Sequence, residues 1–236
     1  MLKFENLNIY TKDKTLVKNV SFSIERGEIL SLVGESGSGK SLTCLSVLSI
    51  LAEQLSVSGS IFFTDRNGHA ERIDNMSHKK RKEYALKKIA YVFQEPLTAL
   101  NPVQTCGQQL KENIELCGLK RKNEIDARAC ELLAAVELND FQRVLNSFQF
   151  QLSGGQRQRV MIAMAMAGDP DLIIADEPTT ALDVLLQDEI LGLLKKLCIE
   201  NKRSMLLVSH DIDAVAKFSD RIAVMYLGQI VELGAA

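Results

Sequence analysis

The sequence has no surplus of basic residues. Its 236 residues contain 28 lysines and arginines and 30 aspartates and glutamates, so the formal net charge is −2 at pH 7. Proteins dedicated to nucleic-acid binding usually carry excess positive charge, because their ligand is a polyanion. The charge balance therefore argues against nucleic acid as a partner, although it leaves room for a local basic cluster.

Long apolar runs and paired cysteines are also absent. No apolar stretch approaches the roughly 18 residues that a membrane-spanning helix needs. Lys3 and Glu5 interrupt the first apolar residues, where a secretory signal would have an uncharged core. The five cysteines are scattered, without a Cys-x-x-Cys pair, which favours reduced thiols over metal ligands. These features predict synthesis and residence in the cytoplasm.

What the chain does contain is ordinary for a globular protein: 46% hydrophobic and 25% charged residues. Its length suits one large domain, or one domain that carries an inserted lobe. The basic run at 79–82 lies beside Glu83 and two further lysines, so we interpret it as the solvated face of a surface helix rather than a binding patch.

Hydrophobic periodicity divides the chain into three parts. The first ~65 residues alternate apolar and polar side chains, as strands do. About seventy residues after position 93 have helical patterns, and from Asp171 strands and helices alternate, which indicates a parallel sheet with crossover helices. The individual predictions are strands at 20–24, 28–33, 89–93, 172–175, 205–208, 221–225 and 230–233, and helices at 40–51, 105–117, 123–137, 185–198 and 211–218.

A glycine-rich loop follows the predicted strand at 28–33 and precedes the helix that begins at Lys40. Its sequence matches the pattern G-x-x-x-x-G-K-[ST]. Glycines let successive backbone N–H groups point at phosphate oxygens, and the helix N-terminus is electropositive. Lys40 would contact the β- and γ-phosphates, and the Ser41 hydroxyl could ligate Mg²⁺. The predicted phosphate-binding residues are Gly34, Glu35, Ser36, Gly37, Ser38, Gly39, Lys40, Ser41 and Leu42.

Two acidic residues follow the apolar strand predicted at 172–175. Ligand sites of open α/β sheets lie at the carboxyl ends of strands, where Asp176 and Glu177 would be. Asp176 would orient Mg²⁺, and Glu177 would polarise the water that attacks the γ-phosphorus.

The segment Leu152-Ser153-Gly154-Gly155-Gln156, followed by Arg157-Gln158-Arg159, resembles the signature of the ABC transporter ATPase subunits. Ser153 and the glycines can begin a helix whose N–H groups bind phosphate. A plain helix cap would not need two glycines, because they weaken the first turn.

The resemblance covers the whole chain and implies its fold. It implies an α/β fold: a P-loop NTPase (RecA-like) core with an N-terminal antiparallel β subdomain and an inserted α-helical subdomain. Residues 1–236 would form a single ABC ATPase domain. Residues 1–94 and 166–236 would form the nucleotide-binding core, and residues 95–165 the helical subdomain.

The resemblance also implies a site shared by two chains. ATP held by the phosphate loop of one chain would contact Ser153, Gly154, Gly155 and Gln156 of another. Gln94 would bind Mg²⁺ and the attacking water, together with Ser41 and Asp176 as metal residues. His210 would contact the γ-phosphate, and Tyr10 would stack on adenine. Ala181, Leu182 and Asp183 resemble the loop that communicates across the dimer.

Within the family, the segments at 94–102, 39–43 and 176–184 resemble the peptide/nickel importer branch. That branch implies ATP and Mg²⁺ as cofactors, and nickel or a di- or oligopeptide as the solute taken up. The implied partners are a second copy or a paralogous ATPase subunit, integral-membrane permease subunits and, indirectly, an extracytoplasmic solute-binding protein. The place implied is the cytoplasmic face of the inner (plasma) membrane, as a peripheral subunit. Members usually continue beyond the position that corresponds to Ala236, so a truncated or short variant is expected.

Two other classes remain open. One is a soluble ABC ATPase that acts on DNA or ribosomes, although the chain lacks the coiled coils, zinc motifs or second cassette usual there. The other is a nucleotide-dependent regulatory module without useful turnover, against which Glu177 and His210 argue.

Overall fold

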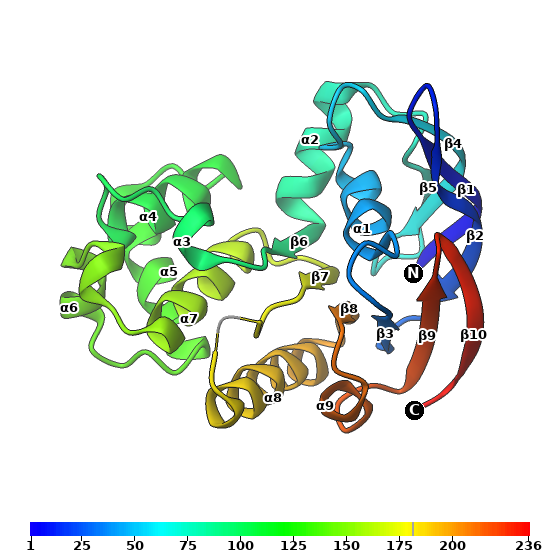
Figure 1. Cartoon of the computed structure of the whole chain (residues 1–236). Coiled ribbons are helices and arrows are strands. Elements are labelled where there is room, and N and C mark those ends of the chain that lie inside the picture. The colour runs from blue at the N-terminus through cyan, green and yellow to red at the C-terminus, as the bar shows by residue number, and fades with distance from the viewer. Residues whose placement is uncertain (181) are drawn as a thin grey trace.

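The computed structural model describes residues 1–180 and 182–236, except the side chains at 78 and 85. Two sheets build the molecule (Figure 1). The smaller sheet is antiparallel, with the order β2-β1-β4-β5. Its strands are β1 (Leu2–Tyr10), β2 (Thr15–Ile24), β4 (Ser56–Thr64) and β5 (Ala70–Arg72).

The larger sheet has six strands in the order β10-β9-β3-β8-β7-β6. Its central strands are parallel, and β10 at the edge is antiparallel to β9. These strands are β3 (Ile29–Val33), β6 (Ile89–Val92), β7 (Leu172–Asp176), β8 (Ser204–Ser209), β9 (Arg221–Tyr226) and β10 (Gln229–Ala235). The predicted parallel sheet is present, because βα units bring successive strands side by side.

The central strands are mostly apolar because both faces of this sheet are covered. Every residue of β3, β7 and β8 is buried, as expected for a parallel sheet between two layers. Leu30 and Leu32 of β3 belong to the core beneath the antiparallel sheet. Ile29 and Val33 point the other way, into the core shared with the helices.

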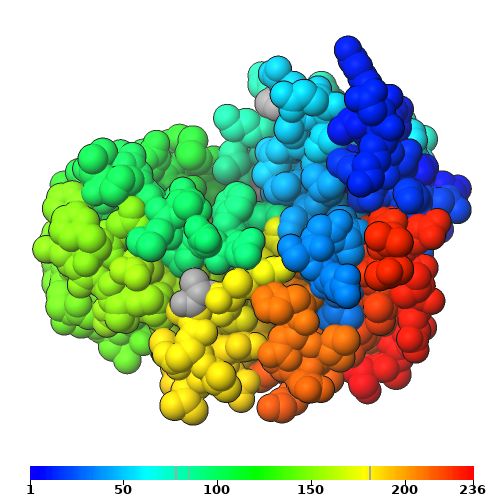
Figure 2. Space-filling view, viewed as in Figure 1, coloured from blue at the N-terminus to red at the C-terminus, as the bar shows by residue number. Residues whose placement is uncertain are grey.

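Helices α1 and α2 lie on the side of the antiparallel sheet, and α8 and α9 on the opposite side of the large sheet (Figure 1). The helices from α3 to α7 form a separate group, green in Figures 1 and 2, beside the sheets. The bounds are α1 (Lys40–Leu48), α2 (His78–Lys87), α3 (Pro96–Ala99), α4 (Cys106–Leu116), α5 (Lys122–Ala135), α6 (Phe141–Asn146), the 3₁₀ turn η1 (Gln149–Gln151), α7 (Gly154–Ala165), α8 (Val184–Asn201) and α9 (Ile212–Ala216).

Some predicted boundaries are wrong. Helix α1 ends at Leu48 and not at position 51, because Ser49 turns into the left-handed region at φ 57°. Its N–H donates to the carbonyls of Leu45 and Ser46 and so closes the helix. Helix α9 is shorter than the range 211–218: Asp211 caps its start, and its side chain accepts from the Ala214 N–H.

In the described ranges, no helix is both long and apolar enough to cross a membrane. The cysteines are free thiols, and Cys44, Cys106 and Cys198 are buried.

Candidate functional site

The glycine-rich loop joins the end of β3 to the start of α1. Gly34 adopts a φ of 152°, and a Cβ placed there would lie 2.1 Å from the carbonyl oxygen of Met225 in β9. Only glycine fits this close approach between loop and strand. The loop ends at Gly39, immediately before α1, so the electropositive end of the helix faces the loop.

Lys40 is buried at the base of the loop, with 4% of its surface exposed. Its Nζ donates to the carbonyl oxygens of Gly34 at 2.7 Å and Glu35 at 2.9 Å. Burial lowers the pKa of Lys40, and the charges of Glu177 and Asp176 oppose that shift. A buried ammonium that is held by neutral carbonyls can turn to an anionic oxygen that enters the loop.

Ser38 is a second feature of the loop that suits an anionic ligand. Its Oγ is buried and has no hydrogen-bond partner among the described residues. Buried hydroxyls are normally satisfied. A phosphate oxygen in the loop would supply the acceptor that Ser38 lacks.

Asp176 ends β7 and faces the start of α1. Its Oδ1 accepts from the Ser41 hydroxyl at 3.0 Å, and its Oδ2 accepts from the Tyr91 hydroxyl at 2.8 Å. Burial raises the pKa of Asp176, while these two hydrogen bonds act in the opposite direction. Ser41 and Asp176 thus present oxygen atoms side by side, as Mg²⁺ requires.

Glu177 follows directly after the strand, and its backbone adopts the left-handed region at a φ of 47°. Its N–H donates to the Val208 carbonyl at 3.0 Å. Its Oε2 accepts from Gln94 Nε2 at 3.1 Å and from Thr180 Oγ1 at 2.9 Å. His210 Nδ1 lies 3.3 Å from the same oxygen. The structure therefore brings together Gln94, Glu177 and His210, which lie in three different segments of the sequence.

A cavity of about 510 Å³ lies between the glycine-rich loop and the side chains of Gln94, Glu177 and His210. It is lined by Leu16, Ser36, Gly37, Gly39, Lys40, Ser41, Leu42, Gln94, Glu177 and His210. Leu16 was not predicted, because an apolar residue in an edge strand carries no signal of ligand contact. Tyr10 ends β1 and is 38% exposed, outside this lining. Its role at adenine stays a prediction.

The residues of the signature segment lie apart from this cavity. Ser153 caps α7: its Oγ accepts from the Gln156 N–H, and the Gln156 side chain accepts from the Ser153 N–H, both at 3.2 Å. Gly154 borders a smaller hollow beside Leu97 and Leu182. Asp183 caps α8 by accepting from the Leu186 N–H at 3.1 Å. Ala181 of the same loop lies outside the described residues.

Oxygen donors suit the predicted metal. No group of three or more His, Cys, Asp and Glu that could hold a metal ion occurs in the described part of the chain. A magnesium ion bound with a nucleotide needs few protein ligands, because phosphates and water complete its shell. The Ser41 hydroxyl, the Asp176 carboxylate and the Gln94 amide fit that requirement.

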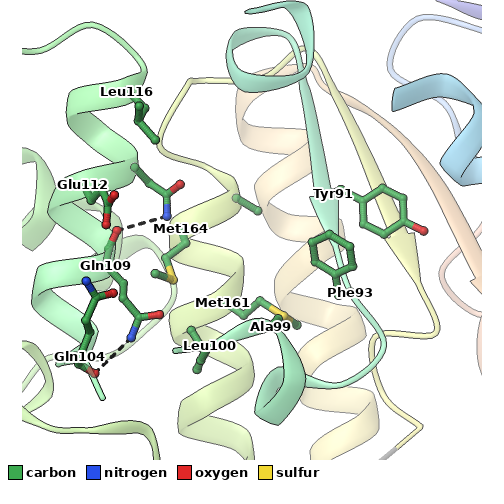
Figure 3. Close-up of a pocket in the computed structure, with 12 residues that line it drawn as sticks. Tyr91, Phe93, Ala99, Leu100, Gln104, Gln109, Glu112, Leu116, Met161 and Met164 are labelled. Atoms are coloured by element: carbon green, nitrogen blue, oxygen red, sulfur yellow. Dashed lines mark hydrogen bonds between the residues drawn. The ribbon is translucent and has the colours of Figure 1, made fainter. Parts of the chain in front are cut away.

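A second hollow, a groove of about 370 Å³, lies between β6 and helices α4 and α7 (Figure 3). Tyr91 and Phe93 form one wall, and Met161 and Met164 of α7 lie between this wall and helix α4. Gln109 and Glu112 of α4, with others of that helix, form the far wall. We call this space the β6–α4 groove.

Comparison with known proteins identifies relatives along most of the chain. A sequence model described as "ABC transporter" matches residues 17–180. The oligopeptide transport ATP-binding protein OppD of Lactococcus lactis subsp. cremoris is 42% identical over 222 residues, which are 94% of this chain and 64% of OppD. The glutathione import ATP-binding protein GsiA of Escherichia coli O157:H7 is 41% identical over 240 residues, 99% of this chain and 38% of GsiA. The chain thus spans less than two thirds of each.

Solved structures resemble the whole chain. The dimeric post-hydrolysis structure of the ATP-binding cassette MJ0796, bound to ADP and Pi, has a TM-score of 0.84 and 31% identity. The match covers 100% of this chain and 98% of that one. The cbiO1 protein of Clostridium perfringens has a TM-score of 0.83 at 30% identity and covers 99% of this chain and 88% of that one. These matches confirm the predicted fold class, a P-loop NTPase core of the kind found in these cassettes.

Proposed function

Because the chain belongs to the ABC transporter family, we propose that it is the ATP-binding and ATP-hydrolysing subunit of an importer. The observation that carries this proposal is the convergence of Gln94, Glu177 and His210 beside the Lys40 loop, in one cavity. These groups suit the hydrolysis of a phosphoanhydride by positioned water and charge neutralisation.

The loop and Lys40 bind the triphosphate. Loop N–H groups and the end of α1 face its oxygens, and Lys40 exchanges its two carbonyl partners for the β- and γ-phosphates. Ser41, Gln94 and Asp176 would hold Mg²⁺, which supplies neutralisation of phosphate charge when bound. ATP and Mg²⁺ are therefore the cofactors that we propose.

Glu177 is the general base in this proposal. Its Oε2 is held by Gln94 and Thr180, so the carboxylate has a fixed position at the cavity. A carboxylate held this way can accept the proton of the attacking water. His210 lines the same cavity and is placed to donate to a γ-phosphate oxygen.

The second half of the site comes from another chain. Ser153, Gly154, Gly155 and Gln156 are at the start of α7, outside the cavity lining of their own chain, and Ser153 is exposed. We propose that they close on the γ-phosphate held by a second copy or a paralogous subunit, with Asp183 at the contact between chains. Tyr10 would stack on adenine. The relative MJ0796 is described as dimeric, which supports this arrangement.

The membrane partners are proposed to meet the helical subdomain, residues 95–165, which inserts between the two parts of the core, 1–94 and 166–236. Closure of two chains on ATP would move permease subunits at the cytoplasmic face of the inner membrane. An extracytoplasmic solute-binding protein would act indirectly. The names of OppD and GsiA refer to an oligopeptide and to glutathione, which supports a di- or oligopeptide as the solute, with nickel as the alternative.

The direct test is phosphate release from ATP by the purified chain, with Mg²⁺ and with EDTA. Metal-dependent release is expected. A chain that binds ATP but never releases phosphate, even with its permease partners, would be a regulatory module and not an ATPase. Peptide uptake by vesicles that contain the reconstituted permease would then test the solute class.

A further inference from the structure

Tyr91 contacts Asp176 of the candidate site through its hydroxyl, a contact that the sequence patterns do not reveal. It lies on β6 and pairs in register with Ile174 of β7. Because side chains alternate along a strand, Ile174 and Asp176 share one face of the sheet, and Tyr91 lies beside them. The Tyr91 hydroxyl crosses to Asp176 and donates to Oδ2 at 2.8 Å.

The tyrosine ring is itself held in place. Its centroid lies 4.6 Å from that of Phe93, with the planes tilted by 47°. Figure 3 shows both rings on the wall of the β6–α4 groove, with the Tyr91 hydroxyl directed away from helix α4. The hydroxyl therefore reaches Asp176 from a fixed base rather than from a flexible side chain.

Each oxygen of the Asp176 carboxylate has a hydroxyl donor. Oδ1 accepts from Ser41 and Oδ2 from Tyr91. Asp176 is only 6% exposed, so water cannot freely replace a missing donor. Without the Tyr91 hydroxyl, Oδ2 would be buried with no partner among the described residues, and rotation of the carboxylate would take Oδ1 away from Ser41.

We propose that Tyr91 is a positioning residue of the nucleotide site, whose hydroxyl fixes the Asp176 carboxylate in the orientation that serves the metal. Removal of a residue that hydrogen-bonds to a metal ligand, without contacting the metal itself, commonly lowers metal affinity. This inference rests on the proposed function, because Asp176 matters in this way only if Mg²⁺ and a nucleotide bind there.

The experiment measures metal affinity without turnover. Mn²⁺ replaces Mg²⁺ and is titrated by electron paramagnetic resonance in the presence of the non-hydrolysable analogue AMP-PNP. Tyr91→Phe is expected to weaken Mn²⁺ binding about tenfold or more. AMP-PNP affinity in EDTA should stay within about twofold of the original chain, since Tyr91 is not part of the cavity lining. Tyr91→Leu, which also lacks the hydroxyl, should lose at least as much Mn²⁺ affinity.

Tyr84→Phe is the matched control. Tyr84 lies on helix α2 and is also half-buried. Its ring packs edge-on against the ring of Phe63 in β4. Its replacement should leave Mn²⁺ affinity unchanged. Equal Mn²⁺ affinity in Tyr91→Phe and the original chain would overturn the inference. So would a parallel loss of metal-free AMP-PNP binding, because it would indicate a disturbed sheet. If the original chain binds no Mn²⁺ with AMP-PNP, the proposed function fails, and the inference fails with it.

Discussion

Replacement of Gly34 by alanine should damage the nucleotide site through steric overlap and backbone strain. The added Cβ would lie 2.1 Å from the Met225 carbonyl oxygen and 3.1 Å from both the carbonyl carbon of Met225 and Ser38 Oγ. The nearest obstacle is backbone of β9, which pairs with β3 immediately before the loop. It cannot move aside as a flexible side chain can, so either the strand or the loop must shift.

The size of the effect follows from two contributions. Overpacking of this kind costs about 1–3 kcal/mol, and the backbone at φ 152° adds about 1 kcal/mol for a residue with a side chain. We therefore expect Gly34→Ala to lower the free energy of unfolding by about 2–4 kcal/mol. The displaced loop should also bind ATP more weakly.

Gly37→Ala in the same loop is the matched control. Gly37 has a φ of 79°, and a Cβ there would meet no atom within 4 Å. Its replacement should cost only the backbone strain, about 1 kcal/mol. Urea unfolding without nucleotide compares the two. If Gly34→Ala is as stable as Gly37→Ala, the close approach of loop and β9 does not constrain this position.

Three further predictions concern single side chains. Glu177→Gln should retain ATP binding but slow phosphate release by about 10²-fold or more, because the general base is lost; near-normal release would refute that role. Lys40→Ala should weaken ATP binding in a calorimetric titration, and unchanged affinity would exclude contact with phosphate. Burial raises the pKa of Asp169, but hydrogen bonds from Arg203 and Arg66 outweigh it and leave the pKa below its ordinary value. This stabilisation is complete above the unfolded pKa and is lost as the pH falls through the folded pKa. We therefore expect Asp169→Asn to lower the free energy of unfolding in urea at pH 7 by about 0.5–1 kcal/mol, a small value because the carboxylate is half exposed. The difference in stability between the variant and the original chain should shrink below about pH 4. A difference that grows in acid would contradict this sign.

The sequence predicted the centre of the large sheet well because its central strands β3, β7 and β8 are buried on both faces. Leu172 to Ala175 has no polar residue, so the strand is visible without any knowledge of its neighbours. The end of α1 was not predictable in the same way. Ser49 stops the helix although the apolar spacing continues to Leu51, because the backbone turn at Ser49 overrides periodicity.

The candidate site likewise contains residues that the sequence predicts and contacts that it does not. Lys40, Ser41 and Glu177 stand in local patterns whose spacing carries the chemistry, so the sequence predicts them. The Tyr91–Asp176 contact joins residues 85 positions apart. It depends on the register of β6 against β7, which no local pattern contains. Contacts of this kind require the folded structure.

The central claim is that the phosphate loop of one chain and the signature helix of another form one site. The most direct measurement mixes two inactive variants, Lys40→Ala and Ser153→Arg, and follows phosphate release. A mixed dimer would contain one pocket with an intact loop from the second variant and an intact signature from the first, so activity well above that of either variant alone is predicted. A mixture no more active than its separate components would contradict the shared site.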